Sequence, residues 1–262
     1  MLTSHLEVLK RSSSRYSASP LFRLPRVSAS SDRVEEWSTI TYGQFERDVE
    51  RYARHWARAL RMKGIPRRSV IGLWYVPFQS NLSEYGLTSV VRLSGLTYVD
   101  CLHIYGISRA GYIPQMFSLR LPNPEVVYEL LRKANARALV YDAGFESVLS
   151  DCTLPVYQAL QTSEIAFVDE ELEPIVPISN ENEVAFIFHT SGSTSGSPKL
   201  VPCSYRWLNT VVQKSNYISR PRNPAGRQDV TVFMYVLTFA YLWSSLKCIL
   251  QWKHEPHRAD IQ

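Results

Sequence analysis

The chain has 262 residues, 45% of them hydrophobic, which is enough for a substantial core in one large domain or two small ones. Its net charge of +5 would suit a nucleic-acid partner, but acidic residues alternate with the helically spaced arginines of 47–61, which favours a solvated helix face and no nucleic acid. The four cysteines are far apart and no segment approaches the roughly 20 apolar residues of a membrane span, so we expect no disulfide framework, no zinc site and a soluble, cytoplasmic protein.

The first part of the chain shows few signs of regular structure. Residues 1–36 have no sustained hydrophobic period and lack the apolar stretch of a secretory signal, so we expect a poorly ordered lead-in with short extended pieces. The pattern then changes, because Thr41 and Gln44 have the spacing of a helix cap and Gly64 and Pro66 mark the end of that helix. Apolar residues recur on one face of it at three- and four-residue steps, namely Tyr42, Phe45, Val49, Tyr52, Trp56 and Leu60.

Short apolar strands and amphipathic helices alternate after this helix. Strands are predicted at 70–74, 112–114 and 138–141, and helices at 97–110 and 125–135. Such alternation predicts βαβ units, and therefore an α/β fold with a mainly parallel sheet covered on both sides.

His103 lies on the predicted helix 97–110 and invites a catalytic interpretation. A lone histidine on a packed helix is more often structural, and we favour that role.

The next part of the chain leads into a second run of extended structure. We expect a short helix at 145–149, a strand near Val156 and an acidic, solvated linker at 169–174. The apolar run 184–188 predicts a buried strand, and 200–202 restarts extended structure. A helix beginning at Ser204 and a strand at 229–234 are expected to follow.

The segment 190–199 joins these two extended runs and combines hydroxyls, two glycines and a lysine. Glycines let backbone N–H groups approach a phosphate, hydroxyls add donors and a lysine adds positive charge, so the segment predicts a polyphosphate-binding loop. It differs from a Walker loop, because Pro198 separates glycine from lysine and no helix follows directly. The alternative is a flexible Ser/Gly linker, which would not need an apolar strand leading into it.

Three segments in order, 40–45, 108–114 and 190–199, resemble successive motifs of the AMP-forming acyl-adenylating enzymes. This family includes acyl-CoA synthetases and the adenylation domains of nonribosomal peptide synthetases. The resemblance covers 37–234 and is strongest to fungal synthetase-like proteins. It implies a partial AMP-binding domain over 37–234, with the incomplete N-terminal part of the adenylation-domain fold.

The resemblance also implies a chemistry, in which a substrate carboxylate attacks the α-phosphorus of ATP, releasing pyrophosphate and leaving an acyl-adenylate. ATP and Mg²⁺ would be the cofactors. A small carboxylic acid would be the substrate, with CoA or a carrier-protein thiol as acceptor. The residues that would hold the triphosphate are Thr190, Ser191, Gly192, Ser193, Thr194, Gly196 and Lys199.

Two stretches depart from the family pattern. The segment 75–92 lies where family members pass almost directly from strand to helix, and we interpret it as an insertion, either a retained intron or a surface loop. The match fades after residue 234, so 235–262 is expected to be a divergent or disordered tail. His254, His257 and Cys248 in this tail have poor metal-ligand spacing.

The family's later nucleotide motifs and its C-terminal domain with a catalytic lysine have no counterpart here, so no catalytic residue and no metal ligand is assigned. One hypothesis is therefore an adenylating fragment that is weakly active or inactive alone. The other is a noncatalytic truncated product or interaction module.

Overall fold

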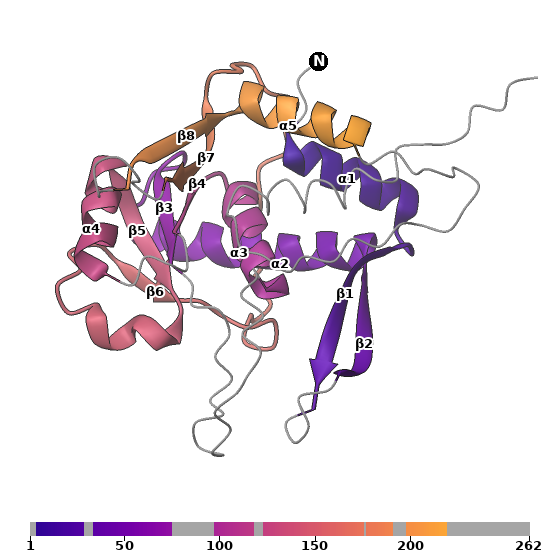
Figure 1. The fold of residues 1–262 in the computed structure, drawn as a ribbon, viewed down its shortest axis with the longest axis horizontal. Helices are drawn as coiled ribbons and strands as arrows, with labels where there is room; N and C mark the ends of the chain where they lie inside the picture. Colours follow the sequence, from indigo (N-terminus) through magenta and orange to yellow (C-terminus); the bar gives the residue numbers. More distant parts are fainter. Residues whose placement is uncertain are drawn as a thin grey trace, which may run out of the picture.

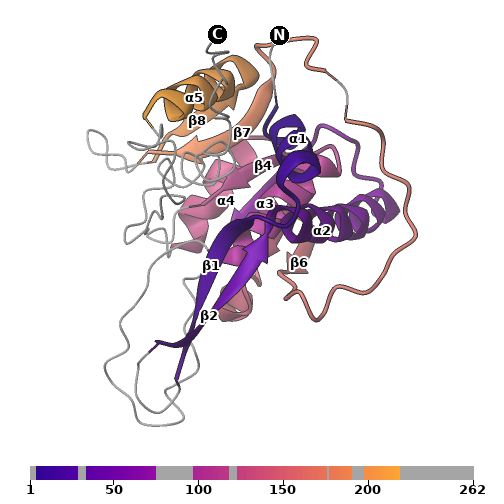
Figure 2. The ribbon, with the colours of Figure 1, turned by 90° about the vertical axis from the view of Figure 1, so that its right-hand side faces the viewer.

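The computed structural model describes residues 4–28, 34–74, 97–117, 123–175, 177–190 and 198–218. Within them a six-stranded, mostly parallel sheet is packed against helices, and a two-stranded ribbon projects away from this body (Figures 1 and 2). The expected α/β class with βαβ alternation is thereby confirmed. No helix in these ranges is both long enough and apolar enough to cross a membrane.

The N-terminal segment corrects the expectation of a poorly ordered lead-in at 1–36. Its described residues include helix α1 (His5–Tyr16), which begins with a reciprocal cap. Ser4 Oγ accepts a hydrogen bond from Glu7 N at 3.1 Å, and Glu7 Oε2 accepts one from Ser4 N at 2.7 Å. Hydrophobic periodicity misses this helix because its buried face has few apolar side chains, whereas the cap specifies its start.

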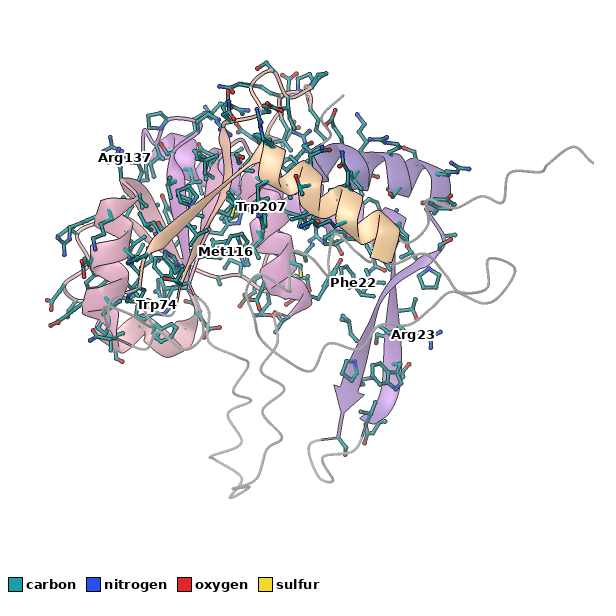
Figure 3. The ribbon with its side chains drawn as sticks, turned by 45° about the horizontal axis from the view of Figure 1, so that its top comes forward. Phe22, Arg23, Trp74, Met116, Arg137 and Trp207 are labelled. Atoms are coloured by element: carbon teal, nitrogen blue, oxygen red, sulfur yellow. The ribbon has the colours of Figure 1, made fainter. Side chains whose placement is uncertain are left out.

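The projecting ribbon consists of β1 (Pro20–Val27) and β2 (Val34–Thr41), which pair in antiparallel fashion. Phe22 packs edge-on against Phe45 with the ring centroids 5.2 Å apart. Figure 3 shows Phe22 on the side of the ribbon that faces the helices and Arg23 on the opposite side. The ribbon is thus attached to the body through the aromatic face of its base.

Helix α2 (Tyr42–Met62) confirms the first predicted helix. Thr41 Oγ1 accepts a hydrogen bond from Gln44 N at 3.2 Å, as the cap spacing predicts. Every residue of its predicted apolar face is buried, namely Tyr42, Phe45, Val49, Tyr52, Trp56 and Leu60.

The sheet has the strand order β6-β5-β3-β4-β7-β8, and only the pair β7–β8 is antiparallel. The six predicted strands that fall within the described residues are found there, with bounds shifted by a few positions. Their bounds are Val70–Trp74 for β3, Ile113–Met116 for β4, Ala136–Tyr141 for β5, Val156–Gln158 for β6, Val184–His189 for β7 and Leu200–Ser204 for β8. The expected strand at 229–234 lies outside the described residues.

Helices follow the strands as the alternation predicts. Their bounds are Tyr98–Arg109 for α3, Pro124–Lys133 for α4, Ala143–Val148 for the 3₁₀ helix η2 and Tyr205–Ile218 for α5. Different helices cover the two faces of the sheet. Because side chains alternate along each strand, one strand contributes side chains to the core on each face. On β3, Ile71 and Leu73 join the larger core cluster with α2 and α3, whereas Trp74 joins the cluster that contains the apolar side chains of α4.

Helices α2 and α3 approach each other closely at Gly106. A Cβ at this position would lie 2.7 Å from Tyr52 Cβ and 3.2 Å from the Tyr52 carbonyl carbon. The contact involves backbone and Cβ atoms of α2, which cannot move aside as a flexible side-chain end can. Gly106 therefore sets the separation of the two helices.

We expect Gly106→Ala to lower the free energy of unfolding by about 1–3 kcal/mol, because overpacking outweighs the gain of about 1 kcal/mol in helix propensity. Urea unfolding followed by circular dichroism measures the change. Ser108→Ala on the same helix is the control, since it removes a buried hydroxyl that has no partner among the described residues. Equal stability of Gly106→Ala and wild type would contradict the close approach.

His5 is a buried polar residue without compensation in the described part of the chain. Its ring lies 5.1 Å from that of Tyr105 and 4.8 Å from that of Phe186, measured between centroids, and neither ring nitrogen has a hydrogen-bond partner among the described residues. Burial lowers the pKa of His5 from 6.5 to about 3. Below pH 6.5 the unfolded chain therefore binds a proton that the folded chain does not, and stability falls as the pH falls.

His5→Leu is expected to raise the free energy of unfolding at pH 7 by about 1 kcal/mol, because it removes unsatisfied buried nitrogens at similar volume. It should also flatten the acid side of the stability profile between pH 6.5 and about 3, where a single depressed histidine contributes up to about 1.4 kcal/mol per pH unit. Unfolding in urea at pH 7 and pH 5 measures both effects. Parallel profiles for the two proteins would contradict the assignment.

Candidate functional site

The loop 190–199 connects two strands, β7 and β8, as the sequence predicts, and the structure shows that these strands pair in antiparallel fashion. Its base is closed by two hydrogen bonds: Thr190 N donates to Lys199 O at 3.0 Å, and Lys199 N donates to Thr190 Oγ1 at 3.2 Å. Pro198 is buried beside this closure, whereas the Thr190 and Lys199 residues are exposed. The entry and exit of the loop are therefore fixed together, with the lysine available to solvent.

The structure describes two of the predicted phosphate-binding residues, Thr190 and Lys199, and it brings them together. The other predicted members lie outside the described residues, and they are Ser191, Gly192, Ser193, Thr194 and Gly196. Thr190 Oγ1 accepts from Lys199 N, and because a hydroxyl can donate as well as accept, this side chain also offers a donor suited to an anion.

The loop begins at the carboxyl end of β7, next to the carboxyl end of β4. The two strands are parallel and pair at Gln115 and Ile187. Met116, the last residue of β4, is labelled in Figure 3. The carboxyl edge of a parallel sheet is where ligands bind in open α/β folds, so the topology places the loop at a suitable edge.

His189 anchors the end of β7 to β4 and was not singled out by the sequence. Its Nδ1 lies 3.0 Å from Met116 O and its Nε2 lies 3.1 Å from Gln115 Nε2. Its ring stacks on Phe117 with centroids 4.6 Å apart and an interplanar angle of 17°. The signal that could have revealed it is a polar residue at the end of an apolar strand, directly before the loop.

Burial lowers the pKa of His189 to about 4, opposed by its hydrogen bond to Met116 O. The ring is therefore neutral at pH 7. A carbonyl oxygen can only accept, so Nδ1 carries the proton and donates to Met116 O, which leaves Nε2 as an acceptor for the Gln115 amide.

His103 has the structural role that the sequence favours. It is fully buried, and its Nδ1 accepts from Trp56 Nε1 at 3.1 Å while its Nε2 lies 3.1 Å from Leu160 O. The indole can only donate and the carbonyl can only accept, so the hydrogen is on Nε2. Burial lowers the pKa of His103 to about 3, so the residue stays neutral while it links α2 and α3 to the chain at Leu160.

The acidic segment 169–174 is mostly exposed, and arginine side chains hold it against the body. Arg61 of α2 forms two hydrogen bonds with the Glu170 carboxylate, at 3.0 and 2.8 Å, and Arg109 donates to Glu173 O at 2.7 Å. Arg51 of α2 also donates to Ile165 O, at 2.9 Å. Arg51 and Arg61, two of the helically spaced arginines of 47–61, therefore bind the connection that follows β6.

A metal site was not predicted from the sequence. Within the described ranges no group of three or more His, Cys, Asp or Glu side chains is placed to hold a metal ion. The described loop residues offer hydroxyl and ammonium groups, and both can donate hydrogen bonds to an anion.

Comparisons with known proteins identify the family of the chain. A model of the family described as AMP-binding enzyme matches residues 101–252. The AMP-binding domain-containing enzyme iboA of Amanita muscaria (strain Koide BX008) is 30% identical over 213 residues, which cover 79% of this chain and 37% of iboA. The chain thus spans little more than a third of the length of that relative.

Solved structures share the fold at low sequence identity. O-succinylbenzoate coenzyme A synthetase (MenE) from Bacillus subtilis, in complex with AMP, has a TM-score of 0.60 and 13% identity, with 93% of this chain and 53% of that chain covered. The AMPPNP-bound nonribosomal peptide synthetase FmoA3 has a TM-score of 0.55 and 16% identity, with 94% of this chain and 21% of that chain covered.

His103→Leu tests the structural role of that histidine. We expect it to lower the free energy of unfolding by about 2 kcal/mol or more, because Trp56 Nε1 and Leu160 O lose their buried partner. Thermal and urea unfolding measure this loss. The folded fraction should keep wild-type nucleotide affinity, and a selective loss of nucleotide binding at wild-type stability would instead support a role at the site.

Proposed function

The chain belongs to the AMP-binding enzyme family, and on that premise we propose that it takes part in ATP-dependent activation of a carboxylic acid. The carboxylate oxygen forms a bond to the α-phosphorus of ATP, the bond to the β-phosphate oxygen breaks, and pyrophosphate leaves. The products are an acyl-adenylate and pyrophosphate. The observation that supports this most directly is the closed loop base, which presents Thr190 and Lys199 together at the carboxyl edge of the sheet.

The proposed role of the loop follows from the charge of the reactants. Two anions must meet, so the site must neutralise phosphate charge and hold the groups in line. Lys199 supplies a positively charged side chain, and its backbone nitrogen is bonded to the Thr190 hydroxyl. Ser191, Gly192, Ser193, Thr194 and Gly196 are proposed to complete the triphosphate cradle with hydroxyl and backbone donors.

Mg²⁺ is proposed to accompany the nucleotide, bound chiefly by phosphate oxygens, as is usual for this hard cation. Its chemistry would be to offset phosphate charge as pyrophosphate leaves. No residue of the described chain is assigned as its ligand.

The acid substrate is proposed to be a small carboxylic acid, and CoA or a carrier-protein thiol the acceptor of the acyl group. These assignments belong to whole family members, and the chain spans 37% of the iboA relative. The second candidate function is a noncatalytic interaction module that keeps the family fold.

Isotope exchange between pyrophosphate and ATP separates the two candidates. Exchange that depends on an added carboxylic acid supports activation. A folded protein that binds ATP but shows no exchange across a panel of aliphatic, aromatic and amino acids supports the noncatalytic candidate.

Lys199→Ala is expected to abolish detectable ATP binding, because it removes the positive charge at the loop exit. Isothermal titration calorimetry with the full chain measures the affinity. Lys133→Ala is the matched control, since Lys133 is an exposed lysine that pairs with Glu129 on α4 and lies outside the loop. Identical affinity in wild type and Lys199→Ala would remove the loop from the proposed function.

A further inference from the structure

The geometry points to Gln115 and His189 as a positioning pair that fixes the entry of the phosphate loop from behind, a role that rests on the proposed function of that loop. Neither side chain is proposed to touch the nucleotide. They act through Thr190 and Lys199, the residues that the loop base joins.

The side chain of Gln115, called the fork below, contacts two elements besides its own strand. Gln115 lies on β4 and is fully buried. Its amide nitrogen donates to Leu130 O of α4 at 3.1 Å and lies 3.1 Å from His189 Nε2 on β7. The two amide hydrogens are thereby both used. One side chain thus ties α4, β4 and β7 together.

The histidine continues this connection with a defined tautomer. Because Nδ1–H donates to Met116 O, Nε2 must accept from Gln115, and stacking on Phe117 fixes the ring plane. The ring cannot turn over without losing both hydrogen bonds. The backbone of His189 is therefore held against the end of β4.

The connection reaches the loop through one peptide bond. Thr190 follows His189 directly, and its backbone N and side-chain oxygen bond to Lys199. His189 also pairs with Leu200 across the antiparallel strands. The residue before the loop and the residue after it are therefore held next to each other. A displacement of His189 would shift the proposed phosphate contacts at both ends.

Core stability does not account for a glutamine at position 115. Its Oε1 is buried and has no hydrogen-bond partner among the described residues. An unsatisfied buried oxygen is unfavourable, and an apolar side chain of similar length would avoid it. Placing a donor against Leu130 O and His189 Nε2 is what the amide provides and what leucine cannot.

The experiment compares wild type, Gln115→Leu and Gln115→Glu in the full chain, with two measurements. Long-range ¹⁵N–¹H correlation spectra report the tautomer of His189, and isothermal titration calorimetry reports ATP affinity. Wild type is expected to show the Nδ1–H tautomer. Gln115→Leu and Gln115→Glu both remove the donor to Nε2, and Gln115→Glu also offers an acceptor that favours a proton on that nitrogen.

Both variants are expected to weaken ATP binding about tenfold, through loss of hydrogen bonds that set the loop position. His189→Asn is the conservative variant, because its short amide can still donate to Met116 O. It should retain more affinity than His189→Ala. Val127→Ala is the matched control, since it truncates a fully buried α4 side chain outside the fork and should lower stability without changing affinity.

The outcomes separate the inference from the proposed function. An Nε2–H tautomer in wild type, or unchanged affinity in a folded Gln115→Leu protein, would overturn the positioning pair alone. If Gln115→Leu does not fold, Gln115→Glu and the two His189 variants give the same comparison. Absence of ATP binding by wild type would overturn the proposed function and the pair's role together, even with the expected tautomer.

Discussion

The junction between β4 and β7 is the constraint on which the rest of the structure depends. Backbone pairing between these parallel strands is short, with Gln115 and Ile187 as the Cα partners. Side chains supplement it, because His189 bonds to Met116 O and to the Gln115 amide. Since β7 leads directly into the loop, the position of the proposed phosphate site relative to the parallel sheet is set at this junction.

The opposite side of the sheet shows a second use of neutral histidine. His103 accepts from Trp56 and bonds to Leu160 O, which fixes the chain beyond β6 onto α2 and α3. Both histidines have partners that define one tautomer, and burial lowers the pKa of each. Their common role is to connect elements distant in sequence through a ring that stays uncharged at neutral pH.

The loop and its surroundings divide the chemical work of the proposed site. The loop offers hydroxyls and a lysine, which are suited to phosphate, while the buried Gln115 and the partly buried His189 lie next to its base. A phosphate-binding group is effective only when its position is fixed before the ligand arrives. The closed base between Thr190 and Lys199 meets that requirement at the two described ends of the loop.

The sequence by itself determined the elements and the loop. The apolar face of α2, the cap at Thr41 and the alternation from Val70 to Tyr141 depend on local spacing, which periodicity detects. The motif 190–199 was equally visible, because glycine, hydroxyl and lysine in one short segment are a local pattern. Hydrophobic periodicity did not reveal α1, because the buried face of this helix has few apolar side chains and its start is specified by the cap at Ser4.

Only the tertiary structure decided what lies behind the loop. Gln115 and His189 are 74 positions apart and follow no shared period, and their contact exists because β7 inserts next to β4. The binding of the acidic segment by Arg61 is likewise a contact over 109 positions. Local spacing specifies helices, strands and turns, whereas strand order and side-chain hydrogen bonds between distant segments depend on how the whole chain packs.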